Sequence, residues 1–154
     1  MALDLRDEAD LREAVESVGL PAIVQPMISG NAELLSGVVH DPVFGPLVAF
    51  GPGGVLAELI GQAQIRIAPL TDADATELVL GGKAGRLVRG FRGPGCDASA
   101  LIDLVQRLSR LADDLPEVAE LDLNPVIGLP DGCAVVDVRI HLRRHAPAQR
   151  PKTW

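Results

Sequence analysis

Oxygen-bearing side chains recur at every second position near the C-terminal end of the chain. In the stretch ELDLNP, Glu120, Asp122 and Asn124 alternate with leucines, and the two-residue period of a β-strand puts all three on one face. In the later stretch AVVDVRI, the same period puts Asp137 and Arg139 on one face. If the two stretches pair as a hairpin in matching register, Asp137 comes near Asp122 and Asn124.

This group of oxygens has two interpretations. Carboxylate and amide oxygens without His or Cys are the ligands that Mg²⁺ prefers, above all where substrate phosphates complete the octahedron. Like charges placed in register destabilise a hairpin unless a cation offsets them, which favours a metal site. The alternative is that one face of an antiparallel hairpin is simply solvated, which is common. The spacing alone leaves both interpretations open.

The stretch DPVFGPLVAFGPGG, residues 41–54, is apolar but carries Gly or Pro at seven of its fourteen positions. Gly45 and Pro46 are typical of a turn that leads into the strand LVAF, because Gly permits a positive φ and Pro presets a negative one. The group from Gly51 to Gly54 follows that strand. Bare backbone there would let amide groups approach an anionic ligand.

The elements that must position these residues follow from the apolar periodicity. Helical spacing predicts helices over residues 7–18, 72–80 and 101–115. Alternation and flanking turn residues predict strands over residues 21–28, 32–40, 45–51, 64–68, 118–126 and 133–142. Residues 81–95 hold six glycines and four basic side chains and are predicted to form a mobile loop.

This order of elements predicts an α+β fold with helices packed on one face of a largely antiparallel sheet. We expect one domain over residues 1–145, followed by a loosely held tail over residues 146–154 that is rich in proline and polar residues.

The composition excludes several classes of protein. A net charge of -7 with 14 scattered Lys and Arg argues against nucleic acid as a partner. The apolar runs are shorter than the roughly 18 residues of a membrane span, and the charged N-terminus is unlike a signal peptide. The two separated cysteines, Cys96 and Cys133, are expected to be reduced thiols in a cytoplasmic protein.

Several stretches, taken in order, resemble one family: the ATP-grasp domain of the NDP-forming acyl-CoA synthetases, relatives of the succinyl-CoA synthetase β chain. They cover most of the chain from Ile23 to Arg139. The stretches are IVQPMISGNAELLSGV, HDPVFGPLVAFGPGGVLAE, RIAPL, RGFRG and ELDLNPV with VVDVR.

The resemblance implies roles for particular residues. Gln25, Pro26 and Met27 match the hinge that receives the adenine of ATP or ADP, and Glu33 matches an acid that contacts the ribose. The residues that match the Mg²⁺ ligands are Asp122, Asn124 and Asp137.

The remaining matches concern the reacting phosphates. Gly53 and Gly54 match a loop near them, and Arg66 matches a position with a catalytic role that faces the same cleft, as do the arginines of RGFRG. We therefore expect Gly53→Val or Gly54→Val to reduce nucleotide-dependent activity before it reduces the stability of the fold.

The implied reaction transfers phosphate from a nucleoside triphosphate through a phosphohistidine and yields acyl-CoA, ADP and phosphate. The part of the family pattern that the chain matches is the C-terminal half of the ATP-grasp domain. The first half, with its phosphate-binding lysine, and the CoA-binding domains would precede Met1 or lie elsewhere. We therefore expect the isolated chain to be inactive and to need those parts as partners.

Two other functions remain open at this point. Gln62 is an amide where the family often has an acid, which fits a degenerate module that senses nucleotides or mediates assembly without turnover, for example in an acetyltransferase fusion. A structural domain that forms homo-oligomers is the third interpretation, because a missing half could leave an apolar surface exposed.

Overall fold

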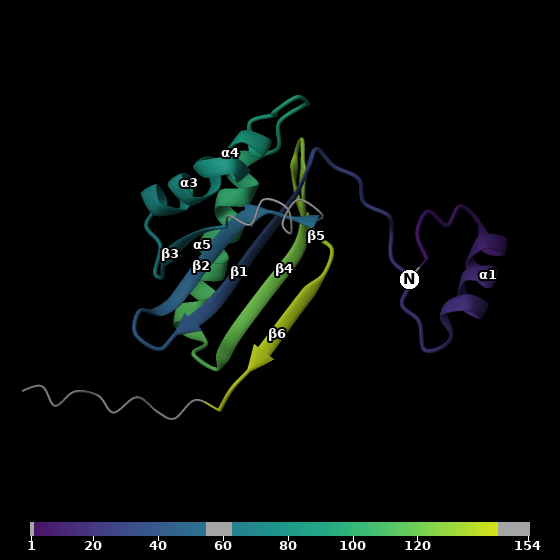
Figure 1. Ribbon diagram of the computed structural model, residues 1–154, viewed down its shortest axis with the longest axis horizontal. Helices are drawn as coiled ribbons and strands as arrows, with labels where there is room; N and C mark the ends of the chain where they lie inside the picture. The colour runs from purple at the N-terminus through teal and green to yellow at the C-terminus, as the bar shows by residue number, and fades with distance from the viewer. Residues whose placement is uncertain (1, 55–62, 145–154) are drawn as a thin grey trace, which may run out of the picture.

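The computed structural model describes residues 2–54 and 63–144 (Figure 1). The strands are β1 (Ala32–Asp41), β2 (Gly45–Pro52), β3 (Gln64–Ile67), β4 (Val118–Leu129), β5 (Gly132–Val135) and β6 (Val138–Leu142). The helices described are α1 (Glu8–Val18), α3 (Asp72–Leu80), α4 (Gly82–Val88) and α5 (Ala98–Asp114).

The strands form one antiparallel sheet in the order β3-β2-β1-β4-β5, and β6 also pairs with β4. Strands β5 and β6 divide the outer edge of β4 between them. Strand β5 pairs with residues 126–129, and β6 pairs with residues 118–123. The predicted α+β fold with a largely antiparallel sheet is confirmed.

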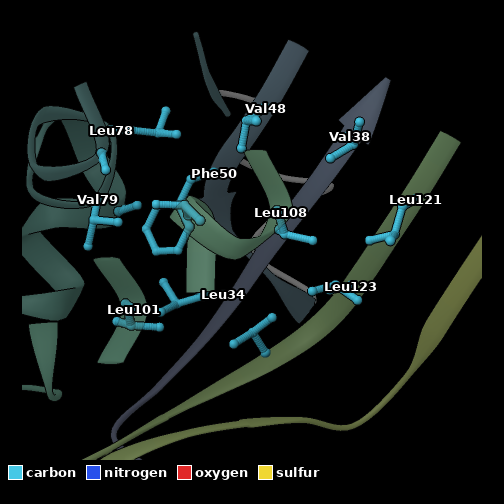
Figure 2. Close-up of a cluster of buried hydrophobic side chains, with 14 of the residues drawn as sticks. Leu34, Val38, Val48, Phe50, Leu78, Val79, Leu101, Leu108, Leu121 and Leu123 are labelled. Carbon is cyan, nitrogen blue, oxygen red and sulfur yellow. The ribbon is translucent and has the colours of Figure 1, made fainter. Parts of the chain in front are cut away.

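Helices α3, α4 and α5 cover one face of the sheet (Figure 1). Alternate residues of the strands point at them, and Figure 2 shows Leu34, Val48 and Phe50 packed against Leu101 of α5 and Leu78 of α3. All five side chains are fully buried. We call the side of the sheet away from these helices the open face.

Strand β4 changes its alternation at a bulge. Leu34 of β1 pairs with Val126, but Ser36 pairs with Leu123, so Asn124 and Pro125 together face a single residue of β1. A bulge of this kind is a usual place for proline in a strand, because proline has no N–H to donate to the ladder. The chain that pairs with β4 is interrupted at the same level, since β5 ends at residue 135 and β6 begins at residue 138.

The N-terminus of α5 is capped by Asp97, whose backbone N–H also donates to the carbonyl of Leu129 at the end of β4 (2.8 Å). Its carboxylate accepts hydrogen bonds from the backbone N–H groups of Ser99 (3.0 Å) and Ala100 (3.1 Å). The Ser99 hydroxyl, these N–H groups and the N–H of Gly132 hold the pKa of Asp97 below its ordinary value. The cap therefore joins the helix layer to the end of the sheet.

Asp97→Ala should lower the thermal midpoint at neutral pH, because the carboxylate that caps the helix is lost. Since the pKa of Asp97 is lowered on folding, its contribution is complete above the unfolded value of about 4 and disappears as the pH falls through the folded value. Thermal unfolding between pH 7 and pH 3 should thus show the gap between wild type and variant closing in acid. Asp113→Ala, at an exposed position of α5, should give a small gap at every pH; an equal gap for both variants would contradict the capping role.

Three predictions about elements are wrong. Residues 21–28 do not form a strand; they are extended and exposed, and they have no strand partner in the described sheet. The segment 133–142 is two strands rather than one. Residues 82–88 form α4 instead of a loop, because Ala84, Gly85 and Val88 are buried against the core and packing outweighs the low helix propensity of glycine.

Helix α1 is formed as predicted, with Asp7 as its N-cap, but it buries none of its residues. Figure 1 shows it apart from the sheet, at the end of the extended segment that precedes β1. Within the described part of the chain, no helix has the length and apolar character needed to cross a membrane. The predicted tail, 146–154, and Gln62 lie outside the described residues.

Candidate functional site

The open face presents small and acidic side chains at its centre. Gly37 of β1 lies opposite Ala49 of β2 on one side and Asp122 of β4 on the other. Asp122 in turn lies opposite Arg139 of β6. A Cβ at Gly37 would lie 2.6 Å from the carbonyl oxygen of Leu121, so β1 and β4 pair closely beside Asp122 only because this residue is glycine.

The register brings the three predicted metal ligands together. Leu123 pairs with Val138, so Asn124 and Asp137, the next residues along the two strands, are neighbours at the bulge. Asp122 lies one residue before Leu123 on the same side of the sheet as Asn124. The Asp137 carboxylate accepts one hydrogen bond, from the backbone N–H of Val138 (3.0 Å).

These three side chains suit a hard cation that takes its remaining ligands from a bound substrate and water. Over residues 2–54 and 63–144, no group of three His, Cys, Asp or Glu side chains could hold a metal ion by itself. The set at the bulge has two carboxylates and one amide oxygen. Mg²⁺ typically takes one or two carboxylates from the protein and its remaining ligands from phosphate and water. The donor set is therefore of the right kind, provided that phosphate oxygens complete it.

Glu33, Gly53, Gly54 and Asn124 meet at the end of the open face where β2 leaves the sheet. The N–H of Gly53 donates to the carbonyl of Glu33 (3.0 Å), and the N–H of Gly54 donates to Oδ1 of Asn124 across 3.4 Å, a long hydrogen bond. The Glu33 side chain lies directly against the Cα of Gly54, where a Cβ would overlap its carboxylate. The predicted ribose acid is thus next to the predicted metal ligands.

The contacts of the two glycines separate their roles. The N–H of Gly53 is already bonded within the sheet, and a Cβ at this position would overlap the backbone of Leu34. Gly53 therefore joins β2 to β1. Gly54 has a positive φ of 57° and a long bond to a side chain that can turn, so it is the better placed of the two to contact a ligand.

Arg66 does not lie with this group. It pairs with Val48, whose side chain is buried under the helices, so Arg66 is on the covered face of the sheet. Its guanidinium forms an ion pair with Glu77 of α3 (3.0 Å) and donates to the carbonyl of Ile65 (3.0 Å). Its catalytic assignment stays a prediction, and the geometry gives it a structural partner instead.

The geometry around Arg66 yields a paired test. We expect Arg66→Ala and Glu77→Ala to lower the free energy of unfolding by similar amounts, about 1 kcal/mol or less, because the ion pair is partly exposed. We expect nucleotide binding to be unchanged in both, as measured by calorimetry. A loss of nucleotide affinity in Arg66→Ala alone would support the catalytic assignment.

Gln25, Pro26 and Met27, the predicted adenine hinge, lie in the exposed extended segment before β1. Within the described residues this segment does not pack on the open face, and Met27 is 61% exposed. The arginines of RGFRG lie beyond α4. Arg92 is over the ring of Phe91, 5.5 Å from its centroid, and Arg89 donates to the carbonyl of Leu80 (2.7 Å).

The sequence did not show which side of β3 faces outward. Ile65 and Ile67 are 51% and 55% exposed on the open face, and Val39 of β1 is 43% exposed on the same face. The alternation of polar and apolar residues predicted a strand over residues 64–68 but could not assign its faces. The pairing with the neighbouring strand decides the faces, since the fully buried Val48 and Phe50 of β2 lie opposite Arg66 and Gln64.

Comparisons with known proteins agree on one relationship. A family-wide sequence profile described as "ATP-grasp domain" matches residues 1–142. The chain is 47% identical over 121 residues to acetate–CoA ligase [ADP-forming] I of Archaeoglobus fulgidus, a match that covers 78% of this chain and 18% of the ligase. It is 31% identical over 153 residues to acetate–CoA ligase [ADP-forming] I subunit beta of Pyrococcus furiosus, covering 91% of this chain and 66% of that subunit.

A solved structure shows the same fold. An acetyl-coenzyme A synthetase from Ca. Korarchaeum cryptofilum, in complex with coenzyme A and Mg-AMPPCP, is similar with a TM-score of 0.84 and 41% sequence identity. The match covers 92% of this chain and 67% of that one. The chain thus corresponds to part of each of these enzymes, from about a fifth of the Archaeoglobus ligase to two thirds of the Korarchaeum chain.

Proposed function

Since this chain belongs to the ATP-grasp domain family, we propose that it binds the magnesium complex of a nucleoside triphosphate on its open face, as part of an ADP-forming acyl-CoA ligase. The observation that carries the proposal is the register at the bulge of β4, where Asp122, Asn124 and Asp137 come together beside Glu33. The Korarchaeum enzyme, which is 41% identical, was solved with a magnesium nucleotide analogue.

Each residue of the group has a proposed task. Asp122, Asn124 and Asp137 would hold Mg²⁺, which offsets the charge of the β- and γ-phosphates when it is bound. Glu33 would accept hydrogen bonds from the ribose hydroxyls. Gly54, which offers no side chain, would leave room for the phosphates between Glu33 and Asn124.

The chain's contribution to the reaction is positioning. The overall change is acid, CoA and ATP to acyl-CoA, ADP and phosphate, and phosphoryl transfer needs the reacting groups in line and their charge offset. The open face supplies one wall of the nucleotide site. We propose that the first ATP-grasp half and the CoA-binding domains act together with it, because the chain spans only part of the length of relatives named as ligases or as β subunits.

We further propose that the protein works in the cytoplasm, as the sequence predicts. Cys96 and Cys133 are free thiols here, and a cytoplasmic protein keeps such thiols reduced.

The direct experiment uses the full-length protein with ATP, Mg²⁺, CoA and a panel of short-chain acids. Calorimetry measures Mg-ATP binding, and chromatography measures ADP and acyl-CoA. We expect ADP and acyl-CoA to form in equal amounts and only when acid, CoA and Mg²⁺ are all present. Binding of Mg-ATP without turnover would support the non-catalytic nucleotide-sensing module instead, and absence of nucleotide binding would contradict both.

A further inference from the structure

Gly30 and Asn31 form the junction between the sheet and the part of the chain that precedes it. Every residue from Gly19 to Gly30 is exposed, and helix α1 buries none of its residues. Figure 1 shows this segment leaving the start of β1 as an extended chain toward α1. The contacts made at the junction therefore set the direction in which the N-terminal part leaves the sheet.

Asn31 is bound to two separate parts of the chain. Its backbone N–H donates to the carbonyl of Gly128 on β4 (2.8 Å). Its side-chain Nδ2 donates to the carbonyl of Gly95, between α4 and α5 (2.7 Å). The backbone bond extends the β1–β4 ladder by one residue beyond Ala32, which pairs with Gly128. The side-chain bond adds a tie to the segment between α4 and α5.

The acceptor of the side-chain bond is itself fixed to the same end of the sheet. Immediately after Gly95, the N–H of Cys96 donates to the carbonyl of Val88, and the N–H of Asp97 donates to the carbonyl of Leu129, both at 2.8 Å. The Asn31 amide is therefore anchored to a point that is held by α4 on one side and by β4 on the other.

Gly30 brings the chain close to β4 just before Asn31. A Cβ at this position would overlap the Ile127 side chain and would lie 2.6 Å from the carbonyl oxygen of Gly128. Ile127 is Glu33's partner across the ladder. At the junction, Gly30 thus packs closely against β4, and Asn31 is held by its two hydrogen bonds.

We propose that Asn31 is a positioning residue for the bound nucleotide. By tying the start of β1 to Gly95 and Gly128, it fixes the angle between the segment with residues 25–27 and the strand with Glu33. This inference rests on the proposed function, in which residues 25–27 receive the base and Glu33 receives the ribose. Residues 25–27, which would receive the base, precede Asn31, and Glu33, which would receive the ribose, follows it. A change of backbone angle at Asn31 would therefore move the base contact away from the ribose contact.

The test compares variants at Asn31 in the full-length protein by calorimetry with Mg-ATP and with CoA. Asn31→Ala removes the amide donor, and Asn31→Asp keeps the shape but sets a carboxylate against the Gly95 carbonyl. We expect both to raise the Kd for Mg-ATP roughly two- to tenfold, the net worth of one hydrogen bond. The Kd for CoA should not change. Asn31→Gln keeps an amide donor and should recover most of the affinity.

Gln106→Ala is the matched control. It removes a side-chain amide donor of the same 2.7 Å length, from α5 to Asp72 of α3. We expect it to lower the thermal midpoint while both Kd values stay at those of the wild type, because the protein remains folded at the assay temperature and the lost bond joins α5 to α3, away from the open face. If Asn31→Ala does not fold, the Kd of the shape-matched Asn31→Asp for Mg-ATP tests the positioning role.

Wild-type affinity for Mg-ATP in the folded Asn31 variants would overturn the positioning role and leave the proposed function intact. An equal rise of the Kd in Gln106→Ala would overturn it as well. A wild-type protein that does not bind Mg-ATP would instead refute the proposed function, and the positioning role with it.

Discussion

Asp137→Ala should reduce acyl-CoA formation by the full-length protein roughly 100-fold or more, while its thermal midpoint stays within a few degrees of the wild type. The large loss is expected because the carboxylate would hold a cation that offsets charge on the transferring phosphate, and single groups of this kind typically contribute factors of 10² to 10³. The small structural cost follows from its surroundings, since Asp137 is exposed and, within residues 2–54 and 63–144, its carboxylate accepts a bond only from the adjacent Val138 N–H.

The controls for this experiment come from the same region. Asp131→Ala removes an exposed carboxylate from the β4–β5 turn and should leave turnover unchanged. Asn124→Ala should reduce turnover as Asp137→Ala does, and its effect should shrink when the Mg²⁺ concentration is raised. Unchanged turnover in both Asp137→Ala and Asn124→Ala would refute the metal site at the bulge.

Gly53→Val should destabilise the protein by about 3 kcal/mol or more, enough to lower the yield of folded protein. Gly53 is buried, a Cβ there would overlap the backbone of Leu34, and its N–H holds the end of β2 to Glu33. The obstacle is backbone in the centre of the sheet, which cannot move aside. Chemical denaturation would measure the loss.

Gly54→Ala is the comparison that separates the two glycines. Its Cβ would meet only the carboxylate end of Glu33, which can turn away, although the positive φ adds about 1 kcal/mol of strain. We therefore expect a folded protein with weaker Mg-ATP binding. Equal destabilisation of Gly53→Val and Gly54→Ala would contradict the different roles. The sequence had suggested that both glycines affect activity before stability, and the contact with Leu34 reverses this order for Gly53.

The sequence predicted the parts of the fold that depend on local periodicity. Helix α5 and strands β1, β2 and β4 lie where the apolar spacing put them, because each buries regularly spaced side chains, in β4 on either side of its bulge. The approach of Asp137 to Asn124 also followed from period two, since antiparallel strands in register place alternate residues on one face. These inferences needed only the sequence and the geometry of a hairpin.

Other features depended on contacts between distant segments, which no local pattern contains. Residues 21–28 are apolar enough for a strand but have no strand partner in the described sheet. The α4 segment is rich in glycine, and Gly85 is required there because a Cβ would overlap the backbone of Leu80. Ile65 and Ile67 lie on the open face because helix α3 packs on the other face of β3, where Arg66 pairs with Glu77. In each case a tertiary contact outweighed the local preference.

The bulge of β4 reverses which alternate residues of the strand face the core. Before it, the odd-numbered Leu121 and Leu123 enter the core; after it, the even-numbered Val126 does so. A strand with strict alternation would have to send either Asp122 or Val126 to the wrong side of the sheet. Loss of a single residue at positions 124–125 would remove the bulge and leave Leu123 and Val126 both facing the core, but it would shift the register of β4 against β5 or β6 by one residue. The length of β4 is therefore set by its two partners on the outer edge, β5 and β6, rather than by the packing of its own core residues.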